Sequence, residues 1–317
     1  MTTPDGYSAV RESAGWIERQ DVGRLRLRGT DRRSYLHGLL TNDIESLQPG
    51  EGVYAALLTA QGRMITDMHV YELGDAVLLT LPLPLTERVG DHLDRFIFSE
   101  DVQVEEVTGS TVQMGVYGPS ASRAVQSLRT AHNFLLRSRE FGVDGFEVIS
   151  TQASAEDLVA LLRAAQPVDP ETIEVIRVES GIPRFLADMP ETTIPLEAGI
   201  EDRAISMTKG CYPGQEVIVR VLHRGGGRVA RKLVGIALGP EAELPAAGAR
   251  VFSGDREIGV LTSAVSSRLL ARPLALGYLH RDFTAPGIQV EVESAANTRI
   301  PAAVQNLPVI AAPDRPM

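Results

Sequence analysis

The chain has 317 residues, which at roughly 150 residues per domain suggests two domains, or one large discontinuous unit with a smaller one. Hydrophobic residues make up 44% of it and charged residues 23%, so neither a disordered nor a fibrous protein fits. A formal net charge of −10 has the wrong sign for a general polyanion binder, and we therefore do not expect direct nucleic-acid binding.

Targeting signals and cysteine usage point to the cytoplasm. The first residues, Met-Thr-Thr-Pro-Asp-Gly-Tyr, show no basic region followed by an apolar one, so we expect no secretory signal. The longest apolar stretch, residues 76–85, is far shorter than the roughly 20 residues of a spanning helix, and we expect no membrane partner. A single cysteine, Cys211, excludes an internal disulfide, a zinc cluster of several thiolates and a self-contained iron–sulfur site.

The first half of the chain alternates predicted strands with predicted helices. Alternation with period two predicts a strand over residues 24–28, and Thr30 or Asp31 can cap the helix that follows. Further strands are predicted at 53–58, 64–73, 76–81, 102–107, 111–117 and 146–151, and helices at 84–99, 119–131 and, after a capping box at Ser154, 155–162. These pieces predict an α+β body with antiparallel sheets.

The second half changes character twice. A helix is predicted over 171–180, and the irregular stretch 182–216 that follows has the length of a functional loop. After Arg228 the pattern is of short strands only, at 230–238, 249–252, 257–263, 273–279 and 289–293, which predicts a small β-barrel. We therefore divide the chain into an α+β body, residues 1–228, and a barrel domain, residues 229–317, whose tail from Pro308 we expect to be frayed.

The densest cluster of special residues is Lys-Gly-Cys-Tyr-Pro-Gly-Gln-Glu over residues 209–216. Two glycines and a proline around one cysteine indicate a tight loop, and Gln215 can start the next regular element. Lys209 and a nearby helix start would favour the thiolate and lower the pKa of Cys211 from about 8.5. The alternative is that Cys211 is a small buried apolar side chain, as lone cysteines often are.

Basic residues are concentrated in and after this segment. Six lysines and arginines and His223 stand against one acid, Glu216: Lys209, Arg220, Arg224, Arg228, Arg231 and Lys232. This local reversal of charge could attract an anionic ligand such as a polycarboxylate tail or a phosphate. The alternative is the solvated face of a strand and its turn.

Two carboxylates, Asp67 and Glu197, lie among apolar neighbours. A buried, unpaired carboxylate costs free energy, so on a core face each would need a binding partner or a functional role. In an exposed position neither would need one.

The six histidines share no metal-ligand spacing, and no phosphate loop, dinucleotide fingerprint or nucleophile elbow is present. We therefore predict no metal site.

The motif at 209–216 resembles the K-G-C-Y/F/W-x-G-Q-E signature of the YgfZ family, folate-binding proteins that assist maturation or repair of iron–sulfur enzymes. Other segments resemble the wider superfamily shared with the glycine-cleavage aminomethyltransferase, or T-protein: residues 35–43, 61–67, 177–183, 195–199 and 275–278. This resemblance covers about residues 20–295. It implies a three-lobed ring whose central opening binds tetrahydrofolate and whose last lobe is a β-barrel.

The resemblance also implies roles for individual residues. The acid matching Glu197 would hold the pterin amino groups, and a carboxylate in the segment matching 64–68 would act near the folate nitrogens. Transferases usually show two adjacent acids in that segment. In this chain the first of the two positions is Thr66, so Asp67 is the candidate. A carboxylate suits a pterin, whose N–H and amino groups form a paired donor edge. The other candidate cofactor-binding residues are Arg177, Lys209, Tyr212, Gln215, Glu216, Arg220 and Arg228, with Arg177, Arg220 and Arg228 assigned to the glutamate tail.

The leading hypothesis is a tetrahydrofolate-binding protein that assists iron–sulfur cluster assembly or repair, and through it tRNA modification. Its cofactor would be tetrahydrofolate or a one-carbon derivative, and its partners iron–sulfur enzymes or assembly proteins. Cys211 would act as nucleophile, cluster or persulfide ligand, or redox sensor. The alternative is a tetrahydrofolate-dependent aminomethyltransferase in which Asp67 positions or deprotonates an attacking nitrogen. A third is a folate-responsive module without chemistry, so whether the chain is an enzyme stays open.

Overall fold

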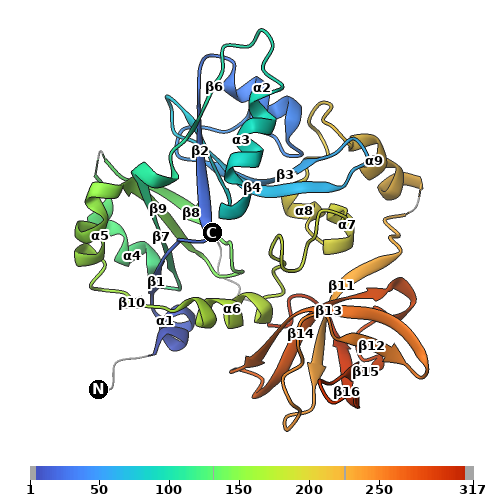
Figure 1. Ribbon diagram of the computed structural model, residues 1–317. Coiled ribbons are helices and arrows are strands. Elements are labelled where there is room, and N and C mark those ends of the chain that lie inside the picture. The colour runs from blue at the N-terminus through green and yellow to red at the C-terminus, as the bar shows by residue number, and fades with distance from the viewer. Residues whose placement is uncertain (1–4, 131, 225, 311–317) are drawn as a thin grey trace. The chain divides into compact units, whose positions relative to one another are not determined.

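The computed structural model describes residues 5–310 except 131 and 225 (Figure 1). The chain divides into two compact units. Unit 1 runs to Arg139 and takes in Val143–Asp169 and Glu201–Gln215, whereas unit 2 consists of Glu140–Gly142, Pro170–Ile200 and the chain from Glu216 onward. Unit 2 therefore contains a helical segment as well as the C-terminal strands.

The first sheet of unit 1 is antiparallel and has the order β3-β4-β5-β2-β6. Its strands are β2 (Val22–Arg28), β3 (Gly52–Leu58), β4 (Met64–Glu72), β5 (Val77–Pro82) and β6 (Gln103–Glu106). Helix α2 (Arg32–Leu39) follows β2, and α3 (Thr86–Asp94) follows β5 through a short 3-10 turn. Asp31 is the N-cap residue of α2, as predicted, although its side chain does not cap the helix.

The second sheet of unit 1 has the order β10-β1-β7-β9-β8, antiparallel except for the parallel pair β1 and β10. Its strands are β1 (Gly15–Glu18), β7 (Thr111–Tyr117), β8 (Phe134–Ser138), β9 (Gly145–Thr151) and β10 (Gln166–Pro167). Helices α1 (Gly6–Glu12), α4 (Ala121–Ala124) and α5 (Ala155–Leu161) also belong to this part of the chain. Apolar side chains of β7, β9, α4 and α5 form one core cluster.

The helix predicted over 119–131 is shorter in the structure. It consists of α4 and a separate 3-10 turn at Gln126–Leu128, the backbone leaves the helical region at Arg129 (φ −74°, ψ 84°), and residue 131 lies outside the described residues. The capping box at Ser154 is also wrong in detail. Helix α5 begins where expected, but the Ser154 hydroxyl does not cap it and lies 3.0 Å from the Thr151 hydroxyl.

Unit 2 is built on a closed barrel of the order β11-β14-β13-β12-β15-β16. The strands are β11 (Arg231–Leu238), β12 (Arg250–Ser253), β13 (Arg256–Ser267), β14 (Arg272–His280), β15 (Gln289–Glu293) and β16 (Arg299–Gln305). Helix α6 (Pro170–Glu179) packs against β13 and β14, and the one-turn helix α7 (Pro195–Ala198) packs against β11. The predicted helix over 171–180 and the predicted barrel are both confirmed.

The stretch predicted to be irregular, 182–216, contains α7, the one-turn helix α8 (Glu201–Ala204) and the first residues of α9 (Gln215–Arg224). The fold class, α+β with antiparallel sheets and a C-terminal barrel, is confirmed, whereas the three-lobed ring stays a prediction. No helix within the described ranges is long and apolar enough to cross a membrane. The first residues, in which we expect no secretory signal, and the tail from Pro308, which we expect to be frayed, fall partly on residues 1–4 and 311–317. These lie outside the described residues.

Candidate functional site

Asp67 lies in the middle of β4, where the alternation of a strand decides which side chains are buried. Its neighbours Thr66 and Met68 are buried on one face, and Asp67 is half-buried on the other. The Tyr54 hydroxyl on β3 donates a hydrogen bond of 2.7 Å to Asp67 Oδ2. The carboxylate therefore has a defined orientation while part of it reaches solvent.

Tyr54 is itself held from three sides by residues that sequence reasoning did not single out. It stands opposite His69 in the β3–β4 pair, with ring centroids 5.1 Å apart. The Arg203 guanidinium from α8 lies 4.5 Å from the centre of the Tyr54 ring. The Asn42 amide donates to the backbone oxygens of Tyr54 (2.9 Å) and Arg203 (3.0 Å). The carboxylate, the ring and the guanidinium thus form one built cluster in unit 1.

The loop around Cys211 also belongs to unit 1, and Cys211 is exposed. The alternative that this thiol is a buried apolar side chain is therefore wrong. The next residue, Tyr212, is buried, and burial raises its pKa to about 12. The loop thus packs through the Tyr212 ring while the thiol stays accessible.

The backbone at the end of this loop, at Gly214, requires a glycine. Its φ is +82°, in the left-handed region, and a Cβ there would lie 2.5 Å from the backbone oxygen of Thr59. The loop therefore approaches the turn between β3 and β4, and that hairpin also carries Asp67 and Tyr54. Cys211 and Asp67 consequently come from segments attached to the same hairpin of unit 1.

Lys209 points to the end of α2. Its ammonium group donates to the backbone oxygens of His37 and Leu40, and it lies 5.2 Å from the centre of the Tyr212 ring. Burial lowers the pKa of Lys209 to about 8, against the opposing effect of Asp43 and Glu45. This side chain therefore anchors the cysteine loop to a helix C-terminus, where carbonyl groups favour a cation.

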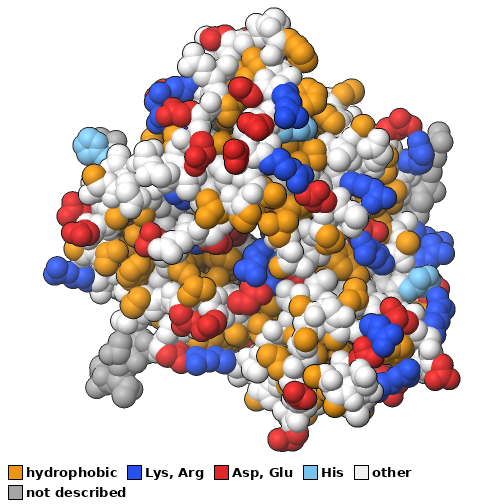
Figure 2. All heavy atoms as spheres, in the orientation of Figure 1, with side chains coloured by type: hydrophobic (Ala, Val, Ile, Leu, Met, Phe, Trp, Pro, Cys, Tyr) orange, Lys and Arg blue, Asp and Glu red, His pale blue; other side chains and the backbone are white. Residues whose placement is uncertain are grey.

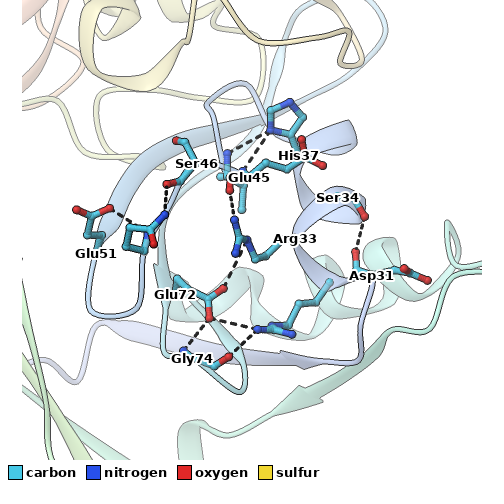
Figure 3. A network of polar contacts seen from close by, with 12 residues as sticks. Asp31, Arg33, Ser34, His37, Glu45, Ser46, Glu51, Glu72 and Gly74 are labelled. Carbon is cyan, nitrogen blue, oxygen red and sulfur yellow. Dashed lines mark hydrogen bonds and ion pairs between the residues drawn. The ribbon is translucent and has the colours of Figure 1, made fainter.

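A polar network surrounds this end of α2 (Figure 3). His37 Nδ1 accepts from the backbone N–H groups of Ile44 (3.3 Å) and Glu45 (3.4 Å). Arg33 Nε lies 3.9 Å from the buried carboxylate of Glu72, and Arg33 also donates to the backbone oxygen of Glu45. The turn that receives Lys209 is thus fixed from several sides.

In unit 2, Glu197 on α7 is paired with Arg231 at the start of β11. Both Nε and Nη2 of Arg231 lie 3.2 Å from Glu197 Oε2. The same guanidinium lies 4.7 Å from the centre of the Tyr278 ring, and burial raises the pKa of Tyr278. The Glu197 side chain is 14% exposed, so a largely buried but charge-compensated carboxylate stands at this position.

Arg177 is buried and bonded within unit 2, which does not favour its predicted role at the glutamate tail. It is 1% exposed, and all five N–H donors are used within unit 2: Nε and Nη2 on Glu174, Nη1 on Asp188 and the Ile182 oxygen, and Nη2 also on Ser263. These bonds tie α6 and the segment after it to β13. We therefore do not carry Arg177 into the proposed ligand set.

The basic segment is partly neutralised inside the protein. Arg220 pairs with Glu216 at 2.6 Å on the exposed face of α9, Arg231 pairs with Glu197, and Lys209 caps α2. Arg228 and Lys232 are exposed, and Gln215 is half-buried at the start of α9, as predicted. Figure 2 shows acidic and basic side chains interspersed over one face of the molecule. No group of metal-ligating side chains was found within the described part of the chain.

Comparison with known proteins decides the family. Residues 3–142 match the GCVT N-terminal domain, and residues 231–310 match the glycine cleavage T-protein C-terminal barrel domain. The chain belongs to the superfamily of the glycine cleavage T-protein. The two matches together span more than half of it, and the barrel match coincides with the closed sheet of unit 2.

Individual relatives extend over nearly the whole chain. The aminomethyltransferase of Geobacillus kaustophilus (strain HTA426) is 27% identical over 90% of this chain and 85% of its own length. That of Lysinibacillus sphaericus (strain C3-41) is 28% identical over 91% and 84%. The crystal structure of the glycine cleavage system aminomethyltransferase T from Bartonella henselae matches with a TM-score of 0.87 and 21% identity over 97% of this chain and 89% of that one. That likeness shows the fold of the T-protein.

Proposed function

We propose that this chain binds tetrahydrofolate or a one-carbon derivative of it, with the Asp67 carboxylate of unit 1 facing the folate nitrogens. The observation that carries the proposal is the Asp67 carboxylate fixed by Tyr54 at 2.7 Å, in a chain of the T-protein superfamily. A carboxylate held in one orientation and still partly open suits a paired N–H edge. Within unit 2, the Glu197 carboxylate, paired with Arg231, is the separate candidate for the pterin amino groups that the resemblance implies.

The comparisons favour one-carbon transfer as the activity, because the curated relatives are named aminomethyltransferases. In this candidate, Asp67 accepts a hydrogen bond from the attacking folate nitrogen and takes its proton as that nitrogen bonds to the carbon of an aminomethyl donor and the bond from this carbon to its leaving group breaks, with the electron pair going to the leaving group. The Tyr54 hydroxyl keeps the carboxylate oriented toward that nitrogen. This candidate makes Asp67 the catalytic residue and gives Cys211 no part.

A second candidate is assistance to iron–sulfur cluster assembly or repair, and through it tRNA modification. The observation that favours it is the exposed thiol of Cys211 within the segment that resembles the YgfZ signature. One thiol cannot hold a cluster alone, so a partner protein would supply the remaining ligands. In this candidate Cys211 acts, and the bound folate supports it.

The arginines left for the glutamate tail are Arg228 and Arg220. Arg228 is exposed, whereas Arg220 would have to exchange its pairing with Glu216. Lys209, Tyr212 and Gln215 contribute by shaping the cysteine loop, since Lys209 is engaged by α2 and Tyr212 is buried. A cytoplasmic location completes the proposal.

Two substitutions, made separately, distinguish the candidates after tetrahydrofolate binding has been measured for each variant. If the chain is a transferase, D67N abolishes aminomethyl transfer and C211A is nearly harmless. If it assists iron–sulfur enzymes, C211A keeps folate binding but fails to restore their activity in a strain deleted for this protein. A folate-responsive module without chemistry tolerates both substitutions once binding is preserved.

A further inference from the structure

Two polar residues in the turn after α2, Thr41 and Asn42, make several hydrogen bonds to other segments of unit 1. The Thr41 N–H donates to the Ala56 oxygen of β3 (3.1 Å), and the Thr41 hydroxyl accepts from the Ala56 N–H (2.8 Å) and donates to the Ala204 oxygen (2.7 Å). The Thr41 backbone oxygen accepts from the Ser206 N–H at 3.0 Å. One side of the turn therefore holds β3, and the other holds the segment that leads into the cysteine loop.

Asn42 adds the bond that concerns the candidate site directly. Its amide nitrogen lies 2.9 Å from the Tyr54 oxygen and 3.0 Å from the Arg203 oxygen, so both hydrogens of one NH₂ group are used. Its side-chain oxygen accepts from the Asp43 N–H, which fixes the amide plane. Two residues whose side chains face each other, Tyr54 and Arg203, are thus joined through their backbones by the same group.

We propose that Asn42 is a positioning residue: by tying β3 to α8 it keeps the Arg203 guanidinium over the Tyr54 ring and the Tyr54 hydroxyl on Asp67. The inference rests on the proposed function, because the orientation of Asp67 matters only if that carboxylate receives a ligand. In this proposal Asn42 acts through Tyr54 and not by its own contact with a ligand. Its effect on binding passes through Tyr54, and that route makes the inference testable.

The same turn also reaches the thiol. Ser206, bonded to Thr41, stands five residues before Cys211, and Lys209 anchors the intervening loop to the His37 and Leu40 oxygens at the end of α2. Asn42 holds the Arg203 backbone, three residues before Ser206, so we expect loss of its amide to loosen the first of these two attachments of the cysteine loop. Since Cys211 is the only cysteine of the chain, its rate of alkylation reports on this attachment without any folate.

The experiment combines a double-mutant cycle with thiol labelling. Asn42→Ala removes the amide, and Asn42→Asp keeps the shape and the acceptor for Asp43 but sets an oxygen against two carbonyl oxygens. Each is made alone and with Tyr54→Phe, which removes only the hydroxyl. The matched control is Asn133→Ala, because the Asn133 amide likewise donates to one backbone oxygen, that of Leu128, at 3.0 Å. Thermal melting confirms that every variant is folded.

Calorimetric titration with tetrahydrofolate gives the first result. We expect Asn42→Ala to weaken binding about tenfold in the natural background, the scale of one lost hydrogen bond, and less than about twofold in the Tyr54→Phe background. An equal loss in both backgrounds would mean that Asn42 merely supports the fold, and it would overturn the proposal. Asn133→Ala should change neither value by more than about twofold.

Alkylation of Cys211 by iodoacetamide gives the second result, which separates this proposal from the proposed function. Labelling should become at least about threefold faster in both Asn42 variants and stay unchanged in Asn133→Ala. If the natural chain binds no tetrahydrofolate, the proposed function fails, and faster labelling still supports the attachment made by Asn42. Unchanged labelling in both Asn42 variants would overturn that attachment.

Discussion

Replacing Arg177 with methionine removes a guanidinium that is 1% exposed and whose five N–H donors are all engaged. The group most affected is Asp188, which is fully buried and accepts from Arg177 Nη1 at 2.7 Å. Methionine fills much of the same volume without a charge. The substitution therefore isolates the loss of the ion pair from the loss of packing.

The expected cost follows from what Asp188 retains. Breaking a buried ion pair by removing one partner typically costs about 3–5 kcal/mol. Asp188 still accepts from the Thr262 and Ser263 hydroxyls (2.5 and 2.7 Å) and from the Arg184 N–H (3.0 Å). These neutral donors place the expected loss at the lower end, about 3 kcal/mol, or a fall in melting temperature of roughly 6–12 °C.

The assay is urea unfolding followed by circular dichroism, with Arg184→Met as the control. Arg184 lies 3.4 Å from Glu174, which Arg177 also binds, but its side chain is 53% exposed, so its loss should cost at most about 1 kcal/mol. A loss below about 1 kcal/mol for Arg177→Met as well would refute the structural role assigned here. If instead that variant kept its stability and lost tetrahydrofolate binding, the original prediction of a ligand-binding arginine would be right.

Three further predictions concern the cysteine loop and α9. Gly214→Ala should cost at least about 2 kcal/mol in urea unfolding, because it strains a φ of +82° and meets the Thr59 oxygen, whereas Gly210→Ala, with open space around it, should stay within about 1 kcal/mol. The pKa of Lys209 is about 8 in the folded chain and 10.5 when unfolded, so the unfolded chain binds more protons between these two pH values. The free energy of unfolding of the natural chain, relative to that of Lys209→Met, should therefore rise with pH across this window. A flat or falling difference would contradict the burial of this ammonium. Arg220→Ala should change stability by less than about 0.5 kcal/mol, because both members of its ion pair are exposed; a larger loss would show that the pair does more than cover the surface of α9.

Hydrophobic periodicity predicted most of the fold because most elements carry a clear burial pattern. The alternation of β4 and the run of short strands after Arg228 are examples. Strand β16 was missed because Pro301 lies within it, and proline in a run argues against a strand. The one-turn helices α7 and α8 were missed because four residues show no helical period.

Only part of the candidate site could be predicted from the sequence, because its contacts depend on the pairing register of two strands. The sequence singled out Asp67 by its apolar neighbours, but its partner Tyr54 lies on the neighbouring strand, and the register of β3 against β4 shifts at a bulge between Leu57 and Leu58. A register counted from the turn would therefore have been off by one residue. Arg177 was assigned to the glutamate tail through the resemblance, and the sequence could not separate this role from the other because an arginine binds a ligand anion or a buried carboxylate equally well.

Whether the chain binds tetrahydrofolate through the proposed acceptors is tested most directly by calorimetric titration of the natural chain, Glu197→Gln and the exposed control Glu191→Gln. Glu197→Gln removes the charge that pairs with Arg231 while keeping the shape of the side chain. We predict saturable binding that Glu197→Gln weakens at least about tenfold and Glu191→Gln leaves unchanged. No saturable binding by the natural chain up to about 1 mM tetrahydrofolate would contradict the account.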